Sequence, residues 1–129
     1  FDEVGRRLAG AFWPGPLSLV LDARPGLDEA VLAEDRSIAI RVPGSAVARA
    51  LAARFGGCIT ATSANLSGHP APATPDEVTR QLADRIDLLL DTGPAAGGAP
   101  STIVDTRGGS LRLARAGAIA WDRVLRSVQ

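Results

Sequence analysis

The chain has 129 residues and a formal net charge of zero, with 14 basic side chains against 14 acidic ones. This length predicts one small domain that can bury a real core. Every basic residue is arginine, and the sequence contains no Lys, Tyr or Met. A chain without excess positive charge is not a general nucleic-acid binder, although a local arginine patch stays open. Without lysine, the chain supplies neither a Schiff base nor a P-loop lysine.

A single cysteine excludes an internal disulfide and a multi-cysteine metal site. Cys58 lies in an apolar run, which predicts a buried, unreactive thiol. One histidine, one cysteine and scattered carboxylates have no metal-ligand spacing, so no protein-held metal is expected. His69 is expected to be an exposed loop residue. The sequence has no apolar run of about 18 residues and no charged-then-apolar leader, so we expect a cytoplasmic protein that does not contact membranes.

The first half of the chain predicts two helices and two strands. Phe1 to Leu8 has the apolar spacing of a helix, and Gly10 and the Trp13–Pro16 run end it. Leu17 to Leu21 is typical of a strand buried on both faces. Ser37 to Val42 alternates, which places Arg41 on the opposite face from Ile40. Ser45 is a good N-cap for a helix over Ala46–Phe55, which Gly56 and Gly57 close.

The second half predicts four strands and two helices. The strands are expected over Cys58–Thr62, Leu88–Leu90, Ser101–Asp105 and Leu111–Arg115. Thr74-Pro75-Asp76-Glu77 is a capping box that begins a helix to about Arg85, and Ala118–Val128 forms a last helix. Strands that alternate with helices and end in a hairpin favour an α/β fold with a mixed sheet. We predict a single domain over residues 1–129.

Four irregular segments adjoin these strands and are rich in Gly, Ser, Thr and Asn. They are Trp13–Pro16, Thr62–Gly68, Thr92–Ser101 and Arg115–Gly117. Backbone N–H groups and hydroxyls in such loops bind phosphate or carboxylate oxygens. In open α/β sheets, ligands bind where strands deliver their loops to one edge. The sequence therefore predicts an anion-binding site at an edge of the sheet.

Five side chains are candidates for this site, each with a structural alternative. Ser63 and Asn65 follow a strand and either bind a nucleotide or satisfy their own turn. Ser101 has the same two interpretations. Arg41, half-buried in a strand, needs either an internal carboxylate or a ligand carboxylate. Arg115 either clamps a phosphate or caps the sheet edge.

Five ordered motifs together resemble a known family, the YrdC-like domain of the L-threonylcarbamoyladenylate synthases. Phe12-Trp13-Pro14-Gly15-Pro16-Leu17-Ser18-Leu19 is similar to the family's aromatic-Trp-Pro-Gly-Pro-Leu-Thr-Leu run. The other matching segments are Ile40-Arg41-Val42-Pro43, Thr62-Ser63-Ala64-Asn65-Leu66-Ser67-Gly68, Gly93-Pro94 with Pro100-Ser101-Thr102-Ile103-Val104-Asp105, and Leu113-Ala114-Arg115-Ala116-Gly117-Ala118-Ile119. Any one alone would be weak, but their order along nearly the whole chain makes chance agreement improbable.

The resemblance implies a twisted mixed α/β sheet with flanking helices around a positively charged cavity. It implies an enzyme, a nucleotidyltransferase that makes threonylcarbamoyl-AMP and pyrophosphate from L-threonine, bicarbonate and ATP, with Mg²⁺ carried by the nucleotide. The product serves N6-threonylcarbamoyladenosine modification of tRNA, so tRNA and downstream transfer proteins are implied partners. Carried over by position, the threonine-binding residues are Arg41, Ala61 and Ser101, and the ATP-binding residues are Ser37, Ser63, Asn65 and Arg115. No protein nucleophile is expected.

The sequence departs from the family pattern in three ways. Ala71 stands where the family has a serine that reaches ATP, and Ala116 stands where it has proline. The family's opening Thr-Asp-Thr-x-Tyr-Gly-Leu and Lys-Arg-Pro segments are absent. These segments supply the lysine on the phosphates, so we expect the chain to correspond to the C-terminal part of the domain and to be inactive alone. Two alternatives stay open: a non-catalytic RNA- or nucleotide-binding module, and the carbamoyl-transfer domain of a hydrogenase-maturation-type protein.

Overall fold

The computed structural model describes all 129 residues, which form two compact units. The first unit contains Phe1–Ile59 and Ala99–Gln129, and the second contains Thr60–Gly98. The first unit holds the sheet of the fold. No helix in the chain is long and apolar enough to cross a membrane.

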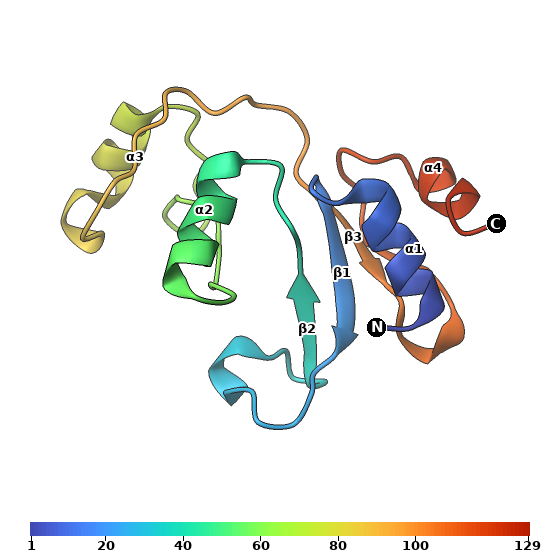
Figure 1. The fold of residues 1–129 in the computed structure, drawn as a ribbon. Coiled ribbons are helices and arrows are strands. Elements are labelled where there is room, and N and C mark those ends of the chain that lie inside the picture. The colour runs from blue at the N-terminus through green and yellow to red at the C-terminus, as the bar shows by residue number, and fades with distance from the viewer. The chain divides into compact units, whose positions relative to one another are not determined.

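The first unit is built on a four-stranded mixed sheet in the order β2-β1-β3-β4 (Figure 1). The central strand β1 (Leu17–Asp22) pairs antiparallel with β2 (Ser37–Ile40) and parallel with β3 (Thr102–Asp105). Strand β4 (Arg112–Arg115) pairs antiparallel with β3, with a bulge between Ile103 and Val104. The mixed sheet predicted from the sequence is therefore confirmed.

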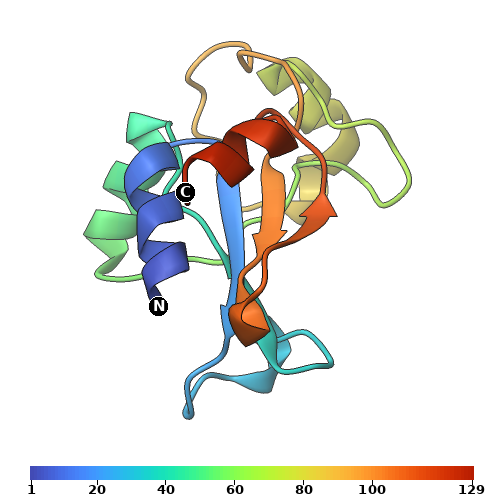
Figure 2. The ribbon, with the colours of Figure 1, turned by 90° about the vertical axis from the view of Figure 1, so that its right-hand side faces the viewer.

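Two helices cover one face of this sheet (Figure 2). Helix α1 (Glu3–Phe12) begins at Asp2, whose carboxylate accepts from the Gly5 N–H, and α4 (Trp121–Arg126) lies beside it. The buried apolar side chains are Leu8, Phe12, Leu17, Leu19, Val104, Ile119 and Val124. Because Leu17 and Leu19 are fully buried in this core, the residues that alternate with them point to the other face of the sheet.

The remaining helix of the first unit, α2 (Ala46–Phe55), has the predicted bounds. Its N-cap Ser45 accepts from the Ala48 N–H, and Gly56 ends it in the left-handed conformation that glycine adopts without steric cost. None of its residues is buried. Short 3₁₀ turns cover Glu29–Val31 and Arg107–Gly109.

The second unit contains one α-helix, α3 (Pro75–Leu82), which a 3₁₀ turn over Ala83–Arg85 extends. The capping box is present: Glu77 N–H donates to the Thr74 hydroxyl, and the Glu77 carboxylate accepts from the Thr74 N–H. The predicted helix and its N-cap at Thr74 are both confirmed.

Several sequence predictions are wrong. Helix α1 continues through Gly10, α4 is shorter than predicted, β2 ends at Ile40 rather than Val42, and β1 is buried on one face rather than on both. Cys58–Thr62 and Leu88–Leu90 are irregular, not strands, and all three leucines are exposed. A strand forms only against a partner backbone, and neither segment pairs with a strand of the sheet. Cys58 is exposed rather than buried, because the strand expected to carry it into the core does not form.

Candidate functional site

Helices α1 and α4 pack on one face of the sheet, and we call the other face the open face. From the strand register, the side chains on the open face are those of Ser18, Val20, Ser37, Ala39, Ile103 and Asp105. Asp22 pairs with Ser37, Val20 with Ala39 and with Asp105, and Ser18 with Ile103. Arg115 pairs with Ile103, so it also belongs to the open face.

At one end of the open face, Ser101 and Arg115 are joined by hydrogen bonds. Arg115 Nη2 donates to the Ser101 hydroxyl (2.9 Å) and carbonyl (2.8 Å), and Arg115 Nε donates to the same carbonyl (3.1 Å). The Ser101 hydroxyl also lies 3.2 Å from the Ser18 hydroxyl. Arg115 therefore fastens the sheet edge, which is one of its two sequence interpretations, and its Nη1 makes no hydrogen bond to protein.

The same end of the sheet carries Arg41, the first residue after β2. Leu19 pairs with Ile40, so one residue further along Arg41 falls opposite Ser18. The Gly15 N–H donates to the Val42 carbonyl (2.8 Å), which holds the Trp13–Pro16 turn beside this segment. The Trp13–Pro14 peptide bond in that turn is cis. Arg41 is exposed, not half-buried in a strand as predicted, because β2 ends one residue before it.

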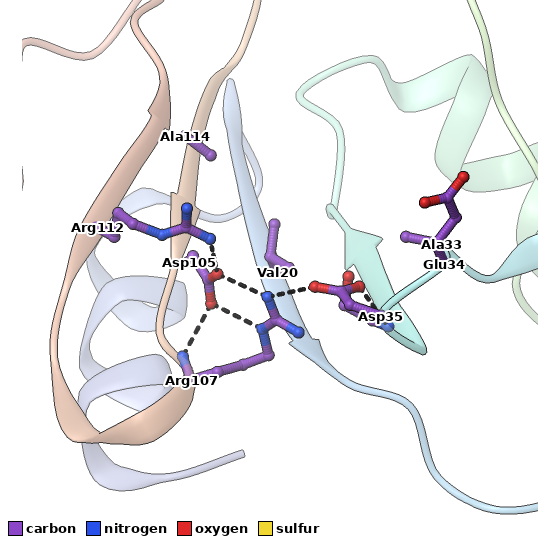
Figure 3. A pocket seen from close by; sticks show the side chains of 9 residues that line it. Val20, Ala33, Glu34, Asp35, Asp105, Arg107, Arg112 and Ala114 are labelled. Carbon is purple, nitrogen blue, oxygen red and sulfur yellow. Dashed lines mark hydrogen bonds and ion pairs between the residues drawn. The ribbon is translucent and has the colours of Figure 1, made fainter.

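At the opposite end of the open face lies an open pocket of about 440 Å³ (Figure 3). Arg107 forms a two-pronged ion pair with Asp105, with Nε–Oδ1 at 3.0 Å and Nη2–Oδ2 at 2.9 Å. Arg107 Nη2 also reaches Asp35 (2.8 Å), and Arg112 Nη2 reaches Asp105 (2.7 Å). Ser37 is buried at this end, where its N–H donates to Asp35 (3.1 Å).

These ion pairs shift the acidities of the groups involved. Hydrogen bonds from the Ser37 hydroxyl and from Arg107 lower the pKa of Asp35 to about 2. Hydrogen bonds from Arg107, and to a smaller extent from Arg112, hold the pKa of Asp105 far below its usual value, although burial of the carboxylate acts in the opposite direction. The Asp105 and Asp35 carboxylates raise the pKa of Arg107 above its ordinary value. The network is therefore fully ionised at neutral pH.

The three candidates in the second unit lie in one exposed turn and the residues before it. Asn65 Nδ2 donates to the carbonyls of Leu66 (2.8 Å) and His69 (2.9 Å), and its Oδ1 is buried without a partner. Gln81 of α3 holds the turn from outside, because its Oε1 accepts from the Leu66 N–H. Ala61 and Ser63 are exposed and irregular. His69 is exposed, as predicted.

The structure thus places four of the seven predicted residues, Ser37, Arg41, Ser101 and Arg115, in the first unit. Ser101 and Arg115 touch, and Arg41 is at their end of the sheet, but Ser37 lies at the other end. Sequence reasoning missed Ser18, Arg107 and Arg112. Strand alternation between buried Leu17 and Leu19 could have identified Ser18, whereas nothing local pairs Arg107 with Asp35.

Comparison with protein families and curated proteins gives consistent matches. Residues 1–117 match the family Sua5_yciO_yrdC, described as "Telomere recombination". A "Putative threonylcarbamoyl-AMP synthase" of Mycobacterium tuberculosis is 38% identical over 95% of the chain, which covers 56% of that protein. The "Threonylcarbamoyl-AMP synthase" of Bacillus subtilis is 37% identical over 95% of the chain and 36% of its own length. The chain spans about half the length of the mycobacterial relatives it matches.

Solved structures agree on the fold. The crystal structure of P. abyssi Sua5 complexed with L-threonine superposes with a TM-score of 0.92 at 29% identity, over 99% of this chain and 38% of that one. The crystal structure of E. coli YciO superposes with a TM-score of 0.84 at 25% identity, over 99% of this chain and 61% of that one.

Proposed function

Because this chain belongs to the Sua5/YciO/YrdC family, we propose that the full-length protein containing it is an L-threonylcarbamoyladenylate synthase. The observation that carries the proposal is the cluster at one end of the open face, where Arg115 and Ser101 are joined and Arg41 falls opposite Ser18. It lies within a fold that resembles Sua5 complexed with L-threonine. We propose that residues 1–129 belong to one YrdC-like domain.

Arg41 binds the carboxylate of L-threonine. Its guanidinium is exposed and forms no ion pair with a protein carboxylate, so it is free to donate two charge-assisted hydrogen bonds to a ligand carboxylate. Ser101 contributes its hydroxyl to the same amino acid, and the family resemblance also assigns the Ala61 backbone to it. Arg115 places a positive charge beside the ATP phosphates, and the family resemblance also assigns Ser37, Ser63 and Asn65 to nucleotide binding.

The threonine nitrogen adds to the carbon of bicarbonate and water leaves, which gives a carbamate. A carbamate oxygen then attacks the α-phosphorus of ATP, and pyrophosphate leaves. The proposed residues hold reactants in register and stabilise developing charge on the phosphate oxygens, and none forms a covalent bond to them. Catalysis by position and charge suits a face that offers guanidinium and hydroxyl donors.

Mg²⁺ enters with the nucleotide, because its preferred ligands here are phosphate oxygens and water. The chain brings together no group of three or more His, Cys, Asp or Glu side chains able to hold a metal ion. We further propose tRNA modification in the cytoplasm as the destination of the product, with downstream threonylcarbamoyl-transfer proteins as its consumers.

The test is pyrophosphate release by the full-length protein with ATP, L-threonine and bicarbonate, with each reactant omitted in turn. Release should require all three. Arg41→Ala should raise the KM for L-threonine more than about tenfold, the effect of losing a charge-assisted pair. Arg24→Ala is the matched control, since Arg24 is an exposed arginine beyond the other end of β1. A well-folded protein that releases no pyrophosphate contradicts the proposal. The 129 residues alone should be inactive, since they contain no lysine for the phosphates.

A further inference from the structure

We propose that Ser18, which no motif assigned to the site, is a positioning residue that orients the Ser101 hydroxyl toward the carboxylate of the amino-acid substrate. The inference rests on the proposed function and adds one residue to its amino-acid subsite. Its starting observation is the 3.2 Å contact between the Ser18 and Ser101 hydroxyls on the open face.

Strand register fixes this contact. Leu17 and Leu19 on either side of Ser18 are fully buried, so Ser18 points to the open face. β1 and β3 run parallel with Ser18 beside Ile103, and Ser101 precedes Ile103 by two residues, which puts its side chain on the same face. Moving the Ser18 hydroxyl to the other face would require a one-residue shift of strand register. Such a shift would turn the buried side chains of Leu17 and Leu19 out of the core.

The hydrogen-bond capacity of Ser101 then limits what its hydroxyl can do. A serine hydroxyl has one donor and two acceptor sites. Arg115 Nη2 occupies one acceptor site at 2.9 Å. If Ser18 donates to the second site, both acceptors of Ser101 are filled and its proton is free for an external acceptor. Arg115 Nε and Nη2 are bound to Ser101, which leaves Nη1 as a further free donor.

The cluster therefore offers two free donors to a ligand, the Ser101 hydroxyl and Arg115 Nη1, and this pair favours an anionic oxygen. The cation on one side of Ser101 polarises its hydroxyl, and hydrogen bonds in a chain strengthen one another. The order Ser18 to Ser101 to carboxylate satisfies every group, whereas without ligand Ser101 can donate to Ser18 instead. Ser18 thus pairs with the Ser101 hydroxyl in both states: it accepts the Ser101 proton without ligand, and it donates to the Ser101 oxygen when that proton turns to the substrate.

The test compares three variants of the full-length protein: Ser18→Ala, Ser18→Val and Ser18→Thr. Without the hydroxyl, Ala and Val variants should raise the KM for L-threonine about fivefold, the worth of one neutral hydrogen bond, and leave the KM for ATP unchanged. Ser18→Thr should restore the wild-type value, since it keeps the hydroxyl. Calorimetric titration with L-threonine should give the same order of Kd. Ser127→Ala, whose hydroxyl donates to Val124 away from the open face, should change nothing.

Three results would each overturn the inference. They are equal rises in the KM for L-threonine and the KM for ATP, an unchanged Kd for L-threonine in Ser18→Ala, and a KM for L-threonine in Ser18→Thr as high as in Ser18→Val. Circular dichroism and the melting temperature distinguish a loss of binding from a variant that is unfolded. If Ser18→Ala fails to fold, Ser18→Val still tests the loss of the hydroxyl, because valine is favourable in a strand. Failure of the proposed function is recognised separately, because wild-type protein itself would then neither release pyrophosphate nor bind L-threonine.

Discussion

The hydroxyl of Thr102 and the backbone of Ile119 form a reciprocal pair: the Ile119 N–H donates to Thr102 Oγ1 (2.9 Å), and Thr102 Oγ1 donates to the Ile119 carbonyl (2.8 Å). Both residues are buried. The pair fastens the segment after β4 to the start of β3, and the Ala118 N–H bond to the Pro100 carbonyl (2.8 Å) reinforces it. Ser101 lies between the attached residues Pro100 and Thr102, and Arg115 comes just before the attached segment, so the pair fixes the end of the open face where Ser101 and Arg115 meet.

Replacing Thr102 with valine should lower the free energy of unfolding by about 2–4 kcal/mol, because two buried backbone groups lose their partner. Urea denaturation measures the change. Thr102→Ser keeps the hydroxyl and should lose only about 1 kcal/mol, the worth of one methyl group. A valine variant as stable as the serine variant would contradict the importance of the pair.

Replacing Gly117 with alanine should both destabilise the protein and displace Arg115. A Cβ at this position would overlap the Pro100 carbonyl oxygen and lie 2.5 Å from the Thr102 nitrogen. Overpacking against backbone costs about 1–3 kcal/mol. The matched control is Gly10→Ala within α1, where a Cβ meets nothing within 4 Å. This change should raise stability by about 0.5–1 kcal/mol, as alanine does in a helix. Melting temperatures that shift in the same direction for both variants would refute the expected contrast.

Stability should fall in acid as the Asp35–Arg107–Asp105 network is protonated. The pKa of Asp35 is about 2 in the folded chain against an ordinary value of 3.8. The unfolded chain therefore binds protons first, and the contribution of the ionised carboxylate, complete above pH 3.8, is lost as pH falls toward 2. Asp105, whose pKa is also lowered, adds to this slope.

Urea denaturation from pH 5 downward, about one unit above the ordinary carboxyl values, measures this dependence. Asp105→Asn should be less stable at neutral pH and show a shallower slope in acid, since it cannot titrate. Asp87→Asn removes an exposed carboxylate from the second unit and serves as the control. A slope that Asp105→Asn leaves unchanged would argue against the network as its source.

Replacing Asn65 with aspartate should loosen the turn that it holds, because a carboxylate cannot donate to the Leu66 and His69 carbonyls. Hydrogen exchange at the His69 N–H, which bonds to Leu66, should accelerate severalfold. Ser67→Ala alters an exposed serine of the same turn and should leave the exchange unchanged. Unaltered protection in the aspartate variant would show that Asn65 does not organise the turn.

Local patterns predicted the elements that local chemistry determines. Helix α2 has a serine N-cap and a glycine C-cap, and α3 has its capping box, so their starts could be placed to the residue. The four strands of the mixed sheet were predicted from their apolar patterns, and the predictions are correct because each of these strands also pairs with a neighbour. Cys58–Thr62 and Leu88–Leu90 have the composition of strands, but strand formation depends on a partner that composition does not reveal.

The candidate site divides in the same way. Motif order selected Ser101 and Arg115, which the structure brings into hydrogen-bond contact. Sequence could not show that Arg41 lies just outside β2 and is exposed, because a strand end depends on its pairing. Ser18 lies within an otherwise apolar strand, and only the parallel register of β1 and β3 brings it to Ser101.

The most direct test of the central claim is the identity of the product. The full-length protein, incubated with ATP, L-threonine and ¹³C-bicarbonate, should yield an adenylate whose mass contains threonine, one labelled carbon and AMP. Mass spectrometry should show this species only when all three reactants are present, and Arg41→Ala should reduce it strongly. A folded protein that binds L-threonine and ATP yet forms no labelled adenylate would contradict the account.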